Sequence, residues 1–233
     1  MLNFKSTFCA MLALLLALPA AAVMKPETSM VLIQEEDGGG SINVTNTSDS
    51  ESLLYVKIYD LPDDKQPQLL VTQPVTRVAA GQVQRVRFVL NTSAPLTREH
   101  MKRVMIEGIP PQNGSAKNTI GLNIRQDIPI IIHPKGLPVL ADPWKLLEWS
   151  VDGGVLNVAN PSAYVVRLAQ EVTLLPSFKK TKLEKTYILP GEKIKVSEAD
   201  AAALKNSSEI QITSLSKYGY LVGDFKLPLS HND

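Results

Sequence analysis

Cysteine is almost absent from this chain, and histidine is scarce. The 233 residues include one Cys and three His. A single cysteine cannot form an intramolecular disulfide, and three histidines leave little material for a zinc or transition-metal centre. We therefore expect no disulfide framework, no metal and no cofactor, and a fold that depends on the packing of a hydrophobic core.

An excess of charge of either sign is also lacking. Lys and Arg total 24 and Asp and Glu total 23, so the formal net charge is +1. Nucleic-acid-binding domains usually carry a basic surplus, because contacts to phosphates supply much of their affinity. The charge balance therefore argues against a nucleic acid as the partner.

Long hydrophobic runs are missing except for one near the start of the chain. Residues 11–18 (MLALLLAL) are apolar but too few to span a bilayer. Lys5 precedes this run, and residues 20–22 (AAA) follow it as a small-residue cleavage site. We interpret residues 1–22 as a secretory signal peptide, and we expect an exported protein that does not insert into the membrane.

The rest of the chain shows the alternation of β-strands. Residues 53–59 (LLYVKIY) and 82–90 (QVQRVRFVL) each place apolar side chains on one face. Turn-forming residues recur between such runs at the spacing of β-sandwich proteins. Helical periodicity is poor, and the best helix candidate is residues 197–205, with Ser197 as its N-cap.

A proline-rich segment at residues 132–143 (IHPKGLPVLADP) divides this pattern in two. Strand-like runs resume beyond it. We therefore place an N-terminal domain at residues 23–140 and a C-terminal domain at residues 141–233. The number and spacing of strands predict an all-β fold of two immunoglobulin-like β-sandwich domains.

Motifs of enzymatic catalysis are missing. No Gly-x-Ser-x-Gly, His-Glu-x-x-His, Walker or dinucleotide-binding motif occurs. Residues 38–40 (GGG) lack the lysine of a phosphate-binding loop and are predicted to form a hairpin turn. Glu99 and His100 are adjacent, but neighbours on a strand point to opposite faces. We therefore expect a protein that is not an enzyme.

In residues 96–111 (LTREHMKRVMIEGIPP), an Arg-Glu pair leads through a strand to Ile-Pro-Pro. This stretch resembles the signature of the PapD-like periplasmic chaperones of the chaperone–usher pathway. Residues 69–90, 155–166 and 217–220 match more weakly, in the order found in that family. The resemblance implies two immunoglobulin-like domains in a boomerang arrangement. It also implies a periplasmic protein that holds pilin or fimbrial subunits and delivers them to an outer-membrane usher.

The resemblance further implies that the last strand of the first domain is donated to a subunit that lacks one strand. Residues 118–128 look like that strand, with Ile120, Leu122 and Ile124 projecting to one face. The same side chains could equally face their own core. The alternative is therefore an exported structural or adhesive β-sandwich protein that donates no strand. An exposed apolar donor strand would also favour a self-capping homodimer of the free protein.

Two positions that hold the subunit in this family are not matched. Members usually carry an Arg on the first strand and a Lys on the donor strand, which together grip the C-terminal carboxylate of the subunit. Here these positions fall on Met30 and on Pro129, which lacks a backbone N–H and suits an exposed edge. The nearest replacement candidates are Arg125, Lys25 and Lys135.

The cleft between the domains departs from the family in a similar way. The family tends to place a Glu, an Arg and an Asp there as an ionic cluster. Glu99 matches, whereas the other two positions fall on His133 and Lys217. A direct Glu99–Lys217 pair is therefore predicted as a substitute.

Overall fold

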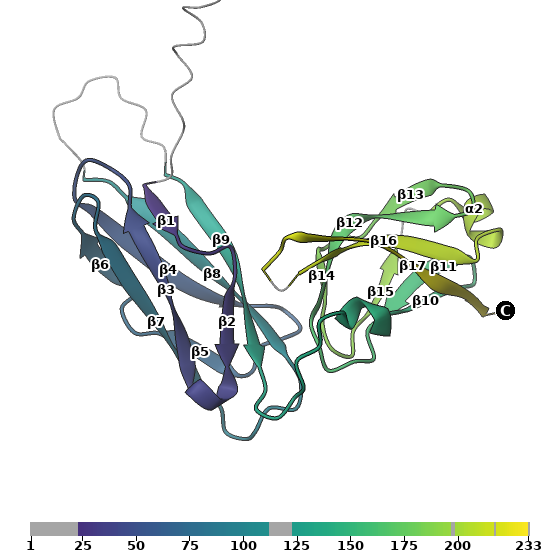
Figure 1. Ribbon diagram of the computed structural model, residues 1–233, viewed down its shortest axis with the longest axis horizontal. Coiled ribbons are helices and arrows are strands. Elements are labelled where there is room, and N and C mark those ends of the chain that lie inside the picture. Colours follow the sequence, from purple (N-terminus) through teal and green to yellow (C-terminus); the bar gives the residue numbers. More distant parts are fainter. Residues whose placement is uncertain (1–22, 112–122, 197–198, 217, 233) are drawn as a thin grey trace, which may run out of the picture.

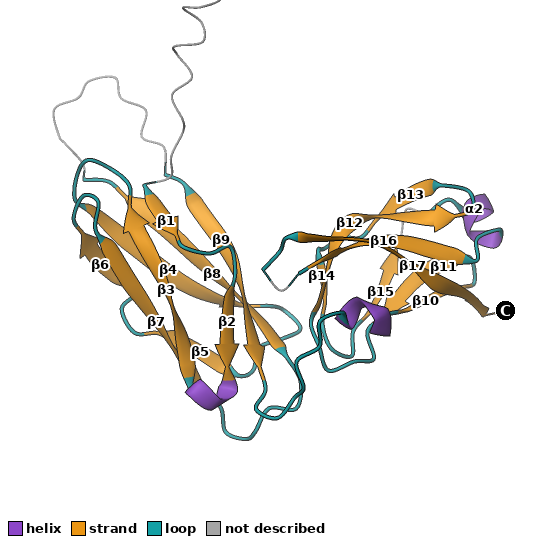
Figure 2. Ribbon diagram, in the orientation of Figure 1, coloured by secondary structure: helices purple, strands orange, loops and turns teal. Residues whose placement is uncertain are grey.

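The structure is a computed structural model that describes residues 23–111, 123–196, 199–216 and 218–232. Its strands gather in two lobes that meet at an angle (Figure 1), and nearly all of its regular structure is β-strand (Figure 2). The prediction of an all-β chain with two β-sheet domains is confirmed. In the described ranges, no helix has the length and apolar character needed to cross a membrane.

The first domain is a nine-stranded sheet that folds into two layers, with the strand order β5-β7-β3-β2-β9-β8-β4-β6 and β1 paired to β3. Its alternating sequences direct Ile42 and Phe88 of one layer and Val104 and Ile130 of the other into a common core. The strands are β1 (Met24–Pro26), β2 (Val31–Gln34), β3 (Gly39–Asn46), β4 (Ser52–Asp60), β5 (Gln68–Val71), β6 (Val75–Val78), β7 (Val83–Asn91), β8 (His100–Ile109) and β9 (Arg125–His133).

The predicted turn at residues 38–40 is built by the 3-10 helix η1 (Glu35–Asp37) and the glycines after it. Gly38 follows η1 in the left-handed region, with a φ of 62°, which glycine adopts without strain. A Cβ on Gly39 would lie 2.2 Å from the carbonyl oxygen of Phe88. The glycine at this position therefore lets β3 lie against β7.

The second domain is an eight-stranded sheet with the strand order β13-β12-β16-β17-β10-β11-β15, and β14 pairs with β12. The 3-10 helix η2 (Pro143–Leu146) leads into it, and Trp149, Leu156 and Ile212 lie in its core. The strands are β10 (Glu148–Asp152), β11 (Val155–Ala159), β12 (Val166–Leu175), β13 (Lys179–Lys182), β14 (Tyr187–Ile188), β15 (Lys193–Val196), β16 (Glu209–Leu215) and β17 (Leu221–Asn232).

The helix of the second domain is shorter than predicted and begins at a different cap. Helix α2 spans Ala201–Lys205, and the side chain of Asp200 accepts a hydrogen bond from the N–H of Ala203 at 2.9 Å. Asp200, and not Ser197, is therefore the N-cap, because an aspartate caps as well as a serine and lies directly before the alanines. Ser197 lies outside the described residues.

Candidate functional site

The last strand of the first domain is paired on one side only along its first half. β9 pairs with β8 from Arg125 to Ile132, whereas β2 pairs with β9 only from Ile130 to His133. Among the described strands, residues 125–129 therefore have β8 as their sole ladder partner. Such a stretch presents unpaired backbone groups, which are a template for another strand. We call residues 125–129 the open half of β9.

Of the three predicted donor side chains, Ile124 lies directly before the open half of β9. It is 40% exposed, so it does not belong to the buried core of its own domain. Ile120 and Leu122 lie outside the described residues. Gln126 donates from its side-chain amide to the carbonyl oxygen of Met24, which places β1 close to this edge.

Pro129 is buried rather than exposed, which corrects the expectation from the sequence. Its register partner on β8 is Arg103. Parallel pairing with β2 begins at the next residue, where Ile130 lies opposite Val31. Pro129 therefore lies where β9 passes from one partner strand to two.

A small apolar cluster joins the two domains. Met30, Met101 and Ile131 of the first domain pack with Val165 and Leu189 of the second. Met30 is only 1% exposed. The side chain at the position where the resemblance expects an arginine therefore serves as an apolar contact between domains.

Glu99 connects the domains by hydrogen bonds on both sides. Its Oε1 lies 2.8 Å from Nδ1 of His133, and its Oε2 accepts from the N–H of Val165 at 2.8 Å. Its own N–H donates to the carbonyl oxygen of Ala163 at 2.8 Å. The side chains of Glu99 and His133 are both almost fully buried. The structure thus brings together two of the three predicted interdomain residues, while Lys217 lies outside the described residues.

Both ring nitrogens of His133 face oxygen atoms. Nε2 lies 2.9 Å from the carbonyl oxygen of Leu137, which can only accept, so Nε2 carries a proton. Nδ1 faces the carboxylate of Glu99. The ring is therefore held from both sides, at the point where the chain leaves the first domain.

The three predicted replacement cations do not form one site. Arg125 donates from Nε to Oε2 of Glu107 at 2.9 Å, at the start of β9. Lys135 follows the end of β9, so about 30 Å of extended chain separates it from Arg125. Lys25 is exposed on β1. The structure thus distributes these three positive charges over the domain.

Two arginines that the sequence did not single out lie closer to the apolar cluster between the domains. Arg103 on β8 donates from Nε to Oδ1 of Asp127 at 2.8 Å and from Nη2 to the carbonyl oxygen of Asp127 at 3.1 Å. Arg167 on β12 places Nη1 3.7 Å from the sulfur of Met30. Burial lowers the pKa of Arg167, and the positive charge of Arg103 lowers it further.

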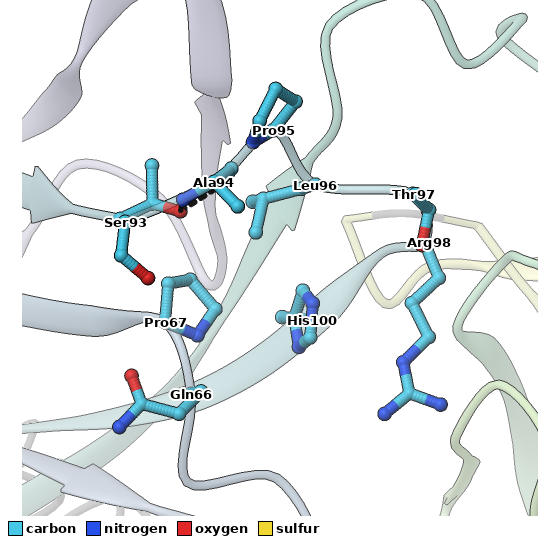
Figure 3. A pocket seen from close by; sticks show the side chains of 10 residues that line it. Gln66, Pro67, Ser93, Ala94, Pro95, Leu96, Thr97, Arg98 and His100 are labelled. Atoms are coloured by element: carbon cyan, nitrogen blue, oxygen red, sulfur yellow. Dashed lines mark hydrogen bonds between the residues drawn. The ribbon is translucent and has the colours of Figure 1, made fainter.

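A hollow lies at the end of the first domain where β8 begins (Figure 3). Gln66, Pro67, His100 and residues 92–98 line it. His100 Nδ1 lies 2.6 Å from Oδ1 of Asp64, which fixes the ring against the loop. Adjacent residues Glu99 and His100 thus have separate partners, as expected for neighbours on a strand. No group of His, Cys, Asp and Glu side chains suited to a metal ion occurs among the described residues.

Two family models cover the chain in succession. The model of the pili and flagellar-assembly chaperone, PapD N-terminal domain, matches residues 23–138, and that of the pili assembly chaperone PapD, C-terminal domain, matches residues 142–223. The chain belongs to the PapD-like family of fimbrial chaperones. The predictions of a periplasmic chaperone of the chaperone–usher pathway and of a protein that is not an enzyme are therefore confirmed.

Similar proteins bear the same description. The uncharacterized fimbrial chaperone YhcA of Escherichia coli K12 is 44% identical over 201 residues, which are 86% of this chain and 88% of the relative. The chaperone protein caf1M of Yersinia pestis is 26% identical over 61% of this chain and 63% of its own.

Solved structures of chaperones share the fold at low identity. A chain of the Salmonella enterica SafA pilin complex with the SafB chaperone superposes with a TM-score of 0.72 at 20% identity, over 91% of this chain and 99% of that one. The periplasmic chaperone SfaE superposes with a TM-score of 0.66 at 21% identity, over 90% of this chain and 100% of its own.

Proposed function

We propose that this chaperone binds pilus or fimbrial subunits by donating β9 to them, and that it delivers them to an outer-membrane usher. The observation that carries the proposal is the open half of β9, which continues from the exposed Ile124. Two similar structures support it, because they are complexes of a chaperone with the SafA pilin and with the tip subunit CsuE.

The proposed binding follows from edge chemistry. A subunit that lacks one strand leaves unpaired backbone groups and an apolar groove. Residues 125–129 supply the missing ladder partner, and Ile120, Leu122 and Ile124 fill the groove with alternate apolar side chains. Backbone pairing tolerates different subunit sequences, whereas the groove selects for apolar donors. Without a subunit, the same edge would pair with a second copy, which we propose as a self-capping homodimer.

The proposal includes the maturation and organisation of the chain. We propose that residues 1–22 are removed as a signal peptide on export, and that the mature protein consists of domains at residues 23–140 and 141–233. The buried Glu99–His133 pair and the Val165 N–H would hold the second domain beside β9. A Glu99–Lys217 pair remains a prediction.

The test is co-purification from the periplasm with the other products of its own operon. We expect Ile124→Glu or Leu122→Glu to lower complex formation at least about a hundredfold, because a charge would enter the apolar groove. Leu70→Glu is the matched control, because Leu70 is 55% exposed on β5, at the far end of the strand order. Its complex should form as in the wild type.

Unfolding of the Ile124→Glu protein in urea would instead show that this side chain supports the core. A folded wild-type chaperone that captures no exported subunit would contradict strand donation. That outcome would favour the alternative, an exported structural or adhesive β-sandwich protein with a chaperone-like fold.

A further inference from the structure

The shortest strand of the first domain contributes to its core but has one unpaired edge. β1 pairs with β3 from Met24 to Pro26, and β3 is its sole ladder partner among the described strands. Met24 is almost fully buried and packs in the core of the domain. A ladder of three residues offers few hydrogen bonds, so other contacts must help to hold β1 in place.

The backbone groups of Met24 point away from β3. On one side of Met24, the N–H of Thr47 donates to the carbonyl oxygen of Val23 at 2.8 Å. After the end of β1, the N–H of Glu27 donates to the carbonyl oxygen of Asn43 at 2.9 Å. Every second residue of a strand points its backbone groups to the same edge, so those of Met24 point to the other one.

The open half of β9 meets this free edge of β1 through one side chain. The side-chain amide of Gln126 donates to the carbonyl oxygen of Met24. Gln126 lies opposite the fully buried Ile106 and two residues before Ile128 of the core, so its side chain points inward from β9. β1 and β9 lie beside each other at this contact (Figure 1). We call it the Gln126–Met24 bridge.

A glycine on β8 leaves room for β1 at the same place. A Cβ on Gly108 would lie 2.8 Å from Cγ of Met24 and 3.0 Å from Cβ of Val23. These distances are shorter than the 3.5 to 4.0 Å or so of an ordinary carbon contact, so a larger residue would displace β1. The position of β1 thus depends on its ladder with β3, on the space at Gly108 and on the bridge.

The bridge lies on the edge that a partner strand needs. Gln126 is the second residue of the open half of β9, and β8 already occupies the other edge there. A strand that adds to residues 125–129 therefore has to enter on the side of β1. It would lie about 4.8 Å from β9, within the space that the bridge now spans. The bridge must therefore open before such a strand can pair.

We propose that the Gln126–Met24 bridge is an autoinhibitory contact, which holds β1 against the open half of β9 in the free chaperone and breaks when a subunit strand pairs there. Gln126 is thus a positioning residue for β1. Because one hydrogen bond has to open, the contact lowers the affinity for a subunit about threefold to tenfold. It also keeps the free edge from pairing with a wrong strand. This inference rests on the proposed function.

The first test measures how firmly β1 is held in the free, full mature chaperone, by hydrogen–deuterium exchange. Gln126→Met keeps the length of the side chain and removes its donor. We expect the amides of Glu27 and Thr47, which join the ends of β1 to β3, to exchange about threefold to tenfold faster. Gln84→Met is the matched control, because the amide of Gln84 donates to its neighbour Arg85 on β7. Its exchange should equal that of the wild type.

The second test measures the capture of a subunit. Tagged wild-type chaperone and an untagged variant compete in equal amounts for a limiting quantity of a subunit encoded in the same operon, which is diluted from denaturant. We expect Gln126→Met to hold about three to ten times as much subunit as the wild type, and Gln84→Met to hold an equal share. Gly108→Ala displaces β1 from the side of β8, so it should also favour the variant and repeats the test if Gln126→Met folds poorly.

The outcomes separate the bridge from strand donation. Faster exchange together with an equal or smaller share of the subunit would overturn the autoinhibitory role, because β1 would be released with no gain in binding. Unchanged exchange in Gln126→Met and Gly108→Ala would overturn it as well, and in both cases the wild type would still capture the subunit. Capture by neither the wild type nor the variants would overturn strand donation and, with it, the autoinhibitory role.

Discussion

The last strands of the two domains pair in the same way, but their surroundings differ. β17 pairs with β16 from Leu221 to Pro228, and in parallel with β10 only from Leu229 to Asn232. This repeats the pattern in which β9 pairs with β8 and then with β2. Each domain therefore ends in a strand whose first part has one described ladder partner.

The corresponding part of β17 carries one packed aromatic side chain and exposed charges. Trp144 packs against Phe225 with ring centroids 4.9 Å apart. Asp224 and Lys226 are exposed on either side of Phe225, and Thr213 donates to Asp224 at 2.5 Å. Cover and charge are the usual means by which proteins keep an edge from pairing. Exposed charges occur on both edges, since Arg125 and Asp127 lie on the open half of β9. The comparison teaches that the shared topology creates an edge in both domains, and that the packing of Trp144 on Phe225 distinguishes β17.

The largest effect on stability is expected from removing the side chain of Glu99, which connects the two domains. Glu99→Ala removes the partner of His133 and of the Val165 N–H in a buried setting, which should cost about 4 kcal/mol of unfolding free energy in urea. Glu36→Ala, an exposed change on η1, is the control. An unchanged free energy of unfolding would contradict the role of Glu99 in holding the two domains together.

The second largest effect on stability is expected from removing the ring of Trp144, which packs against Phe225 of β17. Trp144→Ala should lower the stability of the second domain by about 3 kcal/mol, through the cavity and the lost ring contact. With its cover gone, the edge should also associate in a concentration-dependent way. Calorimetry and sedimentation measure the two effects, and Leu146→Ala, a 41% exposed neighbour on η2, is the control. A monomeric variant would show that the charges on β17 protect the edge without Trp144.

The smallest effect on stability comes from removing those charges. Asp224→Val combined with Lys226→Val should cost about 1 kcal/mol, mainly from the lost hydrogen bond of Thr213. The same change should turn β17 into a pairing edge and produce dimers in size-exclusion chromatography. Glu171→Val with Lys180→Val removes an exposed ion pair of the same domain as the control. A double variant that stays monomeric would argue against a protective role of these charges.

The long strands were predictable because one face of each is buried. β4 and β7 alternate between buried and exposed positions over most of their length, and the buried side of that alternation shows in the sequence. β13 (KKTK) and β15 (KIKV) were not predicted. They lie at the two ends of the strand order, where lysines face the solvent and weaken the apolar pattern.

The site was predictable in part. The positions of Ile124, Glu99 and His133 follow from the resemblance to the family. The pair that the sequence predicted was Glu99–Lys217, and the Glu99–His133 contact was not predicted. Arg103 lies within residues 96–111, the stretch that most resembles the family, but nothing in that stretch points to its role, and Arg167 comes near it only once the two domains pack. The burial of Pro129 was missed as well, because it depends on tertiary packing that the sequence pattern does not show. Properties that arise from the meeting of distant segments are invisible to periodicity.

The four residues of β2 act as a stop for any strand that adds to the same edge of β9. A subunit strand that adds to this edge can extend only as far as β2. The chaperone would therefore set the register of the subunit by the position of its chain end and not by its side chains. One chaperone could then hold subunits of unlike sequence in the same register. A subunit with a frayed, clipped or extended tail would lie out of register and dissociate sooner. The short strand β2 would thus discriminate between intact and altered subunits.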